Sequence, residues 1–333
     1  PPTQVATAMR TLQDLGAVDA KHRNLTPLGV KLSQLHIEPR LGKMLVLSSA
    51  LRCLGSVLSV AASREAKDPF VNIAAADEAR DYLSEGLFSD QLLGAKVCAG
   101  FLEAEHGRRG QAFCERHFLH CGRVRMMTSM RGKLADMIVA AGLVPGFTKG
   151  RSRGLAAAES LSAWEGETEL VRAVVCAGLL PNVARLCDKG GKRRMVLKDG
   201  SKISAQQKSV VQGDRLPKSD GFVCFHELVR TSALFGSDLC LASNYAVVVF
   251  GDSVQRVPDG LLCDGWIRFR AEGEVAEAML RLRGAARRLL DRHVAGIGLG
   301  NKSAETDLEA VFRLFASIRG GDANVPVPRS EVK

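Results

Sequence analysis

Residues 12–45 read "LQDLGAVDAKHRNLTPLGVKLSQLHIEPRLGKML" and hold the strongest local signals in the chain. A helical pattern over residues 3–16, with apolar residues at three-to-four spacing, stops at Gly16. A short hairpin-like stretch follows. Thr26 then stands before a proline, a good N-cap with proline at the first helical position. From Thr26 the pattern predicts almost continuous helix to about residue 142.

The texture changes after Pro181. Apolar residues now come in short runs broken by Gly, Asp and Asn, as in "NVARLCD", "GFVCFHELVR", "LCLASNYAVVVFG" and "GWIRFR". These runs predict five or six strands that close a small OB-type barrel. The stretch "EVAEAMLRLRGAARRLLDRHV" (274–294) predicts an amphipathic helix, and residues 304–318 predict another. The fold class predicted is therefore α+β and multidomain.

Composition narrows the function. The chain has 333 residues, a formal charge of +10 and a pI near 9.3, which favour a polyanionic partner such as nucleic acid. Nine cysteines in apolar stretches indicate free thiols in a reducing, intracellular compartment, without distinguishing nucleus, cytoplasm or mitochondrion. No apolar run is long enough for a membrane span. The chain opens on Pro1 without Met, and we interpret it as a segment of a longer protein.

Two motifs suggest chemistry that their context does not favour. In "FCERHFLHC" (113–121), a continuous helix would place Cys114, His117 and Cys121 on one face, as in a zinc site. No paired C-x-x-C exists to complete the ligands, so a buried stripe is favoured over zinc. The stretch "GIGLGNKS" (296–303) lacks the glycine that a phosphate-binding loop needs before its lysine. No catalytic constellation is found, and neither a catalytic residue, a metal nor a cofactor is predicted in this segment.

Basic residues gather in the first predicted strands. They are Lys189, Lys192, Arg193, Arg194, Lys198, Lys202 and Lys208. A solvated hairpin and a phosphate-binding surface both fit this pattern. A second basic row, on the helix over 274–294, is better explained by surface solvation. Its members are Arg281, Arg283, Arg287, Arg288 and Arg292.

Several motifs resemble one family, in the right order and at the right distances. Residues 12–45 resemble the segment after the second motor domain of DEAH/RHA-type RNA helicases, with its "LTPLG" and "DPRLGKML" steps. The resemblance continues through "FCERHFLHCGRVRMMTSMRGKL", "LVRAVVCAGLLPNVARL", "LKDGSK", "VCFHELVRTS" and "CDGWIRFRA", and covers about residues 1–290. It implies a winged-helix remnant, a helical ratchet and an OB-fold. The family's "HPSS" segment stands here as "QQKS", with Lys208 in place of the first serine.

The resemblance implies a division of the chain. The expected parts are a winged-helix remnant (1–36), a ratchet domain (37–145), a basic linker (146–165), an OB-fold with a leading helix (166–270), a helical extension (271–320) and a disordered tail (321–333). It also implies that ATP and Mg²⁺ bind in RecA-like motor domains upstream of this segment, against which these domains dock. The parent is then expected to be an ATP-dependent RNA helicase. Regulatory proteins are expected on the winged-helix or OB-fold surfaces.

Positions that match the family's motifs are expected to contact single-stranded RNA. They are Lys198, Lys202, Lys208, Ser209, His226, Arg230, Thr231 and Ser232, with Arg123, Arg125 and Arg131 on the ratchet. For each Arg or Lys, a solvated surface charge remains the alternative, and for His226 a buried, hydrogen-bonded imidazole. The alternative function is a stand-alone RNA-binding adaptor or scaffold without motors. The RNA substrate, its direction of travel and the protein partners are not specified by the sequence.

Overall fold

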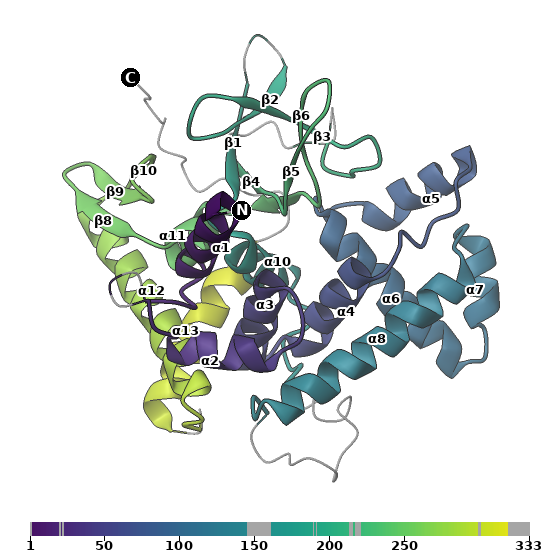
Figure 1. Cartoon of the computed structure of the whole chain (residues 1–333), viewed down its shortest axis with the longest axis horizontal. Coiled ribbons are helices and arrows are strands. Elements are labelled where there is room, and N and C mark those ends of the chain that lie inside the picture. Colours follow the sequence, from purple (N-terminus) through teal and green to yellow (C-terminus); the bar gives the residue numbers. More distant parts are fainter. Residues whose placement is uncertain are drawn as a thin grey trace.

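The computed structural model describes residues 2–19, 21, 23–144, 161–188, 190, 192–212, 216, 221–298 and 301–318. In Figure 1 the helices of residues 74–140 form an arm at the right, and a β-sheet lobe (residues 183–242) lies above the central helices. Two further helices, in residues 273–316, lie at the left, on the side away from the arm. The predicted tail (321–333), Lys189 and most of the predicted linker (146–165) lie outside the described residues. The prediction of a mixed helix-and-sheet fold is confirmed.

Two helices form the N-terminal part, α1 (Pro2–Asp14) and α2 (Pro27–Gln34). The predicted cap of α2 is confirmed, because the Thr26 hydroxyl accepts a hydrogen bond from the Gly29 amide at 3.0 Å and Pro27 is at the first helical position. The same hydroxyl donates to the carbonyl of Gly16 at 2.6 Å, where α1 has ended. Thr26 thereby ties the two helices together.

A helical body follows. Its helices are α3 (Pro39–Ala50), α4 (Leu54–Glu65), α5 (Ala74–Ser84), α6 (Asp90–His106), α7 (Gly110–Arg116) and α8 (Cys121–Ala140). Helix α4 is in the middle and packs against both α6 and α8. Its residues from Val57 to Ala62 are all buried, because this helix is covered on every side.

The stretch 113–121 is not one helix. Helix α7 ends at Arg116, and α8 begins at Cys121 after a turn in which Phe118 has a positive φ of 53°. The prediction that Cys114, His117 and Cys121 share one helical face is therefore wrong. The turn is held by hydrogen bonds to the preceding loop, from the Val71 amide to the Phe118 carbonyl and from the His120 amide to the Pro69 carbonyl. These long-range bonds compensate for the broken helix.

Helix α10 (Thr168–Leu179) leads into the sheet lobe and is almost wholly buried. The strands that follow are β1 (Val183–Asp188), β2 (Arg193–Val196), β3 (Lys202–Ala205), β4 (Gly221–Cys224), β5 (Leu228–Arg230), β6 (Leu234–Gly236) and β7 (Cys240–Ala242). Their order across the sheet is β5-β6-β3-β2-β1-β4-β7. All neighbours are antiparallel except β3 and β6, which run parallel.

Three details of the predicted barrel need correction. The sheet has seven strands instead of five or six. The run "NYAVVVF" forms a helix, α11 (Asn244–Phe250), because the Ser243 hydroxyl caps it by accepting from the Ala246 amide. A continuous apolar run does not by itself separate a buried strand from a buried helix. The run "GWIRFR" joins a separate sheet made of β8 (Val254–Val257), β9 (Gly260–Cys263) and β10 (Ile267–Arg270).

Barrel closure stays a prediction. Within the described residues, the order of strands ends at β5 on one side and β7 on the other, and no pairing joins these two strands. The inward positions of neighbouring strands nonetheless line up, with Leu186 opposite Met195 and Met195 opposite Ile203. All three are buried, so one face of the sheet covers a core.

The two C-terminal helices predicted from the sequence are present as α12 (Gly273–Val294) and α13 (Lys302–Ala316). The basic row on α12 is not uniformly solvated, and that prediction is wrong for Arg283, which is only 6% exposed. Its guanidinium donates to the carbonyls of Val248 and Val249 at 3.0 and 3.1 Å, where α11 ends. Arg288 remains at the surface and pairs with Asp307 of α13.

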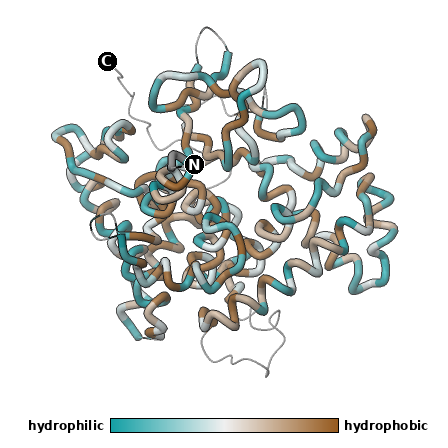
Figure 2. The backbone as a smooth tube through the Cα atoms, viewed as in Figure 1, coloured by the Kyte–Doolittle hydropathy of each residue, from teal (hydrophilic) through white to brown (hydrophobic). Residues whose placement is uncertain are grey.

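Two cores hold the molecule together. The larger one joins α3, α4, α10, α11, α12 and α13. The second joins α5, α6, α7 and α8 to the inner face of the sheet, with Val97, Leu186 and Val223 among its fully buried members. Figure 2 shows the hydrophobic stretches running through the centre of the molecule, with hydrophilic ones along the outer turns. The helical body and the sheet lobe therefore share buried surface, and residues from both can form one site.

Candidate nucleic-acid interface

A partly buried carboxylate joins the helical body to the sheet lobe. Asp90 opens α6, whose N-cap Ser89 accepts a hydrogen bond from the Leu92 amide. The Asp90 carboxylate accepts from the Ser209 hydroxyl at 2.8 and 3.0 Å and from the Val210 amide at 2.7 Å. It also accepts from the Leu239 amide at 2.9 Å. Two segments of the sheet lobe thus meet at one side chain.

Burial raises the pKa of Asp90 to about 6, while the hydrogen bonds from Val210, Ser209 and Leu239 act in the opposite direction. The carboxyl is therefore mainly ionised at neutral pH. An ionised acceptor with three donors is stronger than a neutral one. The junction between the two lobes is accordingly fixed by a charge-assisted cluster instead of by apolar contact alone.

A cavity of about 320 Å³ adjoins this cluster. The helical body contributes Arg64, Arg80 and Asp68, and the sheet lobe contributes Lys208 and Asp238. Arg64 pairs with Asp238 at 2.9 Å, and Arg80 pairs with Asp68 at 2.7 Å. The Lys208 ammonium is 3.2 Å from the Asn72 amide oxygen, and no carboxylate pairs with it among the described residues. Lys208 therefore lines the cavity with an ammonium group that is exposed to solvent.

The topology separates the predicted site residues into two groups. Strands β3 and β6 are parallel neighbours, with Ser204 opposite Phe235. The turns before them, 197–201 and 231–233, therefore lie at one end of the strand pair. The segments after them, 206–209 and 237–239, lie at the other end, where both reach Asp90. Since β3 has four residues, the two ends are about 10 Å apart.

At the far end, all the predicted residues are exposed. Lys198 lies in the β2–β3 turn and Lys202 at the start of β3. The Lys198 ammonium donates to the Asp264 carbonyl at 3.3 Å, next to the small sheet. Arg230, Thr231 and Ser232 form the exposed tip of the β5–β6 hairpin. These five side chains are available to a ligand that crosses the sheet end.

His226 is at the junction but is buried, with 4% exposure. Its Nε2 lies 3.3 Å from a carboxylate oxygen of Glu38, and its backbone pairs with Ser237 and Asn182. Burial, with Arg64 and Arg40 nearby, lowers the pKa of His226 to about 4, so the imidazole is neutral at pH 7. Its other ring nitrogen, Nδ1, is buried and has no hydrogen-bond partner among the described residues. Ser209 is also buried, and its hydroxyl donates a hydrogen bond to the Asp90 carboxylate.

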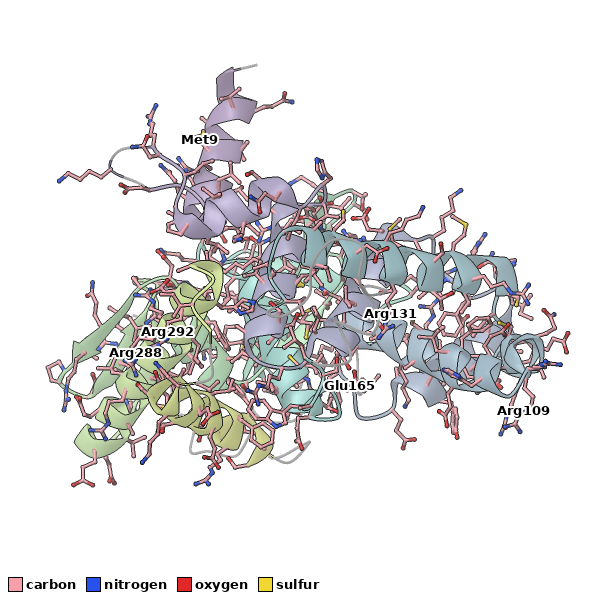
Figure 3. All side chains as sticks on the ribbon, turned by 90° about the horizontal axis from the view of Figure 1, so that it is seen from below. Met9, Arg109, Arg131, Glu165, Arg288 and Arg292 are labelled. Carbon is pink, nitrogen blue, oxygen red and sulfur yellow. The ribbon has the colours of Figure 1, made fainter. Side chains whose placement is uncertain are left out.

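The three ratchet arginines do not form one surface. Arg123 donates to the Asp68 carbonyl at 2.7 Å and so lies beside the junction cavity. Arg125 is exposed on α8. Arg131 donates to the Ser59 hydroxyl at 3.1 Å and lines a separate cavity of about 610 Å³, together with Glu165. Figure 3 shows Arg131 and Glu165 on the side of the molecule seen from below.

The groups at the junction and at the sheet end are suited to binding. In the part of the chain that the structure describes, no group of three or more His, Cys, Asp or Glu side chains is placed to hold a metal ion. The cysteines are all free thiols, and burial raises the pKa of Cys114 to about 12. Ammonium, guanidinium and hydroxyl groups along a groove suit a phosphate backbone. Among the described residues, no helix has the length and hydropathy needed to cross a bilayer.

Sequence reasoning missed three residues of the junction. Asp90, Arg64 and Arg80 line the cavity but were not among the candidates. Ser89 before Asp90 is a recognisable N-cap signal, yet nothing local shows that the acid also accepts from the sheet lobe. Arg64 and Arg80 lie on ordinary helical patterns, so only the tertiary structure reveals their place.

Three family descriptions match the chain in succession. Residues 8–35 match the winged helix of the helicase-associated domain (HA2), residues 38–122 match its ratchet-like part, and residues 171–254 match the oligonucleotide/oligosaccharide-binding (OB)-fold. The last match contains the sheet lobe from β1 to β7, and the second contains α3 to α7.

Curated relatives are similar along most of the chain. The ATP-dependent DNA/RNA helicase DHX36 of Homo sapiens is 32% identical over 304 residues, which cover 85% of this chain and 29% of the relative. The DExH-box ATP-dependent RNA helicase DExH1 of Arabidopsis thaliana is 29% identical over 300 residues, which cover 87% of this chain and 29% of the relative. The DExH-box ATP-dependent RNA helicase DExH3 of the same plant is 27% identical over 322 residues, which cover 95% of this chain and 25% of the relative. The chain thus spans under a third of the length of these relatives.

Proposed function

The chain belongs to the helicase-associated C-terminal region of DEAH-type RNA helicases, and on this premise we propose that it grips single-stranded RNA across the junction between its helical and sheet lobes. The RNA would pass the cavity beside Lys208 and continue over the sheet end that carries Lys198, Lys202 and the tip of the β5–β6 hairpin. The proposed domains are those expected from the sequence, with a closed barrel formed in the sheet lobe.

The observation that carries this proposal is the position of Lys208 and its lack of a carboxylate partner among the described residues. This lysine lies on the sheet lobe, faces the helical body across a cavity, and has only the neutral Asn72 amide as a partner among the described residues. The arginines beside it are each paired with a carboxylate, so among the described residues Lys208 is the cation of this lining that no carboxylate pairs with, while Asp90 in the same lining is held by three donors of the protein. A phosphate that enters the cavity would gain that charge without breaking an ion pair.

His226 and Ser209 take an indirect part in this proposal. Both are buried and bonded within the protein, so they position the ends of β3 and β4 instead of touching RNA. Lys208, Lys198, Lys202, Arg230, Thr231 and Ser232 would make the contacts, with Arg123 beside the cavity. Contacts to phosphate and sugar carry no base information, so the grip would be independent of sequence.

In the parent protein, this region would act with an ATPase. Relatives of this chain are named ATP-dependent helicases, and the chain spans only part of their length. We infer that ATP and Mg²⁺ bind in motor domains outside this segment, and that the segment docks against them as a rigid platform. Regulatory proteins on the winged-helix or OB-fold surfaces remain part of the proposal.

Binding of a labelled twelve-nucleotide oligouridine, followed by fluorescence anisotropy, tests the grip. We expect binding at low salt that weakens steeply as salt rises, with oligoadenosine and oligocytidine bound within a few-fold of oligouridine. Lys208→Glu should weaken binding more than Lys133→Glu, a matched change at an exposed position on α8. Absence of binding at about 50 mM salt, or equal effects of the two variants, would refute the proposed path.

A further inference from the structure

A second surface has the opposite character to the basic junction. On the outer arm, Tyr82 of α5 is 67% exposed. Its ring lies nearly parallel to that of His117, with 11° between the planes and 6.5 Å between the centroids. Phe113 also contacts His117, with 4.7 Å between centroids and 55° between the ring planes, and so restricts the imidazole. An exposed tyrosine thus faces a supported imidazole.

The separation of the two rings suits an inserted group. Rings in direct contact have centroids about 4.5–7 Å apart, so the pair is at the outer end of that range. A planar group between two rings requires about 7 Å, twice the usual contact distance between carbon atoms. A small rotation of the exposed Tyr82 side chain supplies the difference. The pair can therefore close on a flat group from both sides.

The charges around Tyr82 select a cation. Helix α5 carries Asp77, Glu78 and Asp81, and Glu85 is at its C-cap. Its one base, Arg80, pairs with Asp68. Beside Tyr82 lies a cavity of about 350 Å³ that Glu85 lines, and among the described residues no basic side chain lines it. On the opposite side, Arg116 adjoins His117, and Glu115 lies next to it on α7.

This acidic setting disfavours a phosphate backbone, in a chain whose formal charge is +10. A guanidinium group is planar, positively charged, and stacks on aromatic faces more readily than an ammonium. Burial and Arg116 lower the pKa of His117, so its imidazole is neutral near pH 7 and does not repel a cation. Aromatic rings and carboxylates are thus together on one surface.

We propose that the Tyr82–His117 pair and the acidic end of α5 form a docking site for an arginine side chain of a partner protein. The guanidinium would lie between the two rings, with its outer N–H groups directed to Glu85 and Glu78. The surface is on the arm formed by α5 and α7 (Figure 1), and the cavity beside Tyr82 reaches Val210, two residues from Lys208.

The chain offers a simple probe, because it contains only two tyrosines, Tyr82 and Tyr245. Labelling with 3-fluorotyrosine gives two ¹⁹F signals, which Tyr82→Phe assigns. The full chain is titrated with the capped tripeptides Ac-Gly-Arg-Gly-NH₂, Ac-Gly-Lys-Gly-NH₂ and Ac-Gly-Gln-Gly-NH₂, and with oligouridine. We expect a saturable shift of the Tyr82 signal with the arginine peptide, with about three- to tenfold weaker binding of the lysine peptide. The Tyr245 signal should not move.

Variants that keep Tyr82 separate stacking from charge. His117→Ala should abolish the saturable shift, and the pair Glu78→Gln and Glu85→Gln should weaken binding about two- to fivefold. Met126→Ala, at an exposed position on α8, is the matched control and should leave binding unchanged. The proposal is overturned by an equal shift with the glutamine peptide, by a shift with oligouridine instead, or by no shift at tens of millimolar peptide.

Discussion

The Asp90 carboxylate on α6 accepts a hydrogen bond from the Ser209 hydroxyl, 2.8 Å from Oδ2 and 3.0 Å from Oδ1, across the boundary between the helical and sheet lobes. The same carboxylate accepts two backbone amides from segments that follow β3 and β6. One side chain therefore joins two segments of the sheet lobe to the helical body, beside the cavity that Lys208 lines.

Asp90→Ala should lower the free energy of unfolding by about 2–4 kcal/mol, because it leaves the Ser209, Val210 and Leu239 donors without their charged acceptor. Urea unfolding at pH 7 measures the change. Glu103→Ala is the control, since Glu103 is an exposed acid on the same helix and its loss should change stability by under about 0.5 kcal/mol. Equal stability of the two variants would contradict the role of Asp90 as the joint.

Arg283→Met should also destabilise the fold, by about 2–4 kcal/mol. The buried guanidinium donates to the carbonyls of Val248 and Val249 and to that of Asp252 at 2.6 Å. Its removal leaves the Val248 and Val249 carbonyls without this donor, whereas Arg287 still donates to the Asp252 carbonyl at 2.9 Å. Arg281→Met removes an exposed arginine from the same helix and serves as the control. Thermal unfolding should show a lower midpoint for the first variant only, and matching midpoints would refute the capping role.

Arg283 also shows the limit of the sequence as a guide. The helical periodicity of 274–294 predicts α12 correctly, and the Thr26–Pro27 signal predicts the start of α2, because caps and periodicity are local properties. Whether an arginine on such a helix is solvated depends on what packs against it, which local pattern does not show. The "NYAVVVF" run was misassigned as a strand for the same reason, since burial on all sides removes the periodicity that separates helix from strand.

The residues of the candidate site also divide into those that the sequence indicates and those that only the tertiary structure reveals. Lys208 and Ser209 were identified by the resemblance of "QQKS" to a family motif, and both lie at the lobe junction. Asp90 was missed because its partners are 119 or more positions away in the sequence. The pairing of Tyr82 with His117 was equally out of reach, since it depends on the turn that breaks the predicted helix at Phe118.

The contribution of His293 to stability should fall as the pH drops below 6.5. This imidazole is buried on α12, with Nε2 2.6 Å from the Ser49 hydroxyl of α3. Burial, then the charge of Lys31, lower the pKa of His293 to about 4, whereas a backbone hydrogen bond to Leu143 raises it. Since the folded pKa lies below the unfolded value, the contribution is complete above pH 6.5 and is lost as the pH falls towards 4, by up to about 3 kcal/mol.

Urea unfolding between pH 7.5 and 4.5 checks this dependence. His293→Gln keeps a hydrogen-bonding group near Ser49 and does not titrate, so its stability should fall less steeply below pH 6.5 than that of the wild type. His226, whose pKa is also lowered to about 4, contributes with the same sign in both proteins and cancels in the comparison. Parallel pH profiles for the wild type and His293→Gln would contradict the assignment.

The salt dependence of RNA binding distinguishes gripping residues from solvated ones. Each lysine that meets a phosphate of a single strand contributes about 0.7 to the slope of log K against log salt. Lys198→Ala with Lys202→Ala should therefore lower the slope by about 1.4, and Lys208→Ala by about 0.7, since these lysines lie at opposite ends of β3. Lys133→Ala should leave the slope unchanged.

The triple variant should show the sum of the reductions, because the two groups of lysines are separated by the length of the strand and share no partner. An unchanged slope in the double variant would assign Lys198 and Lys202 to the solvated surface and restrict the RNA path to the cavity beside Asp90.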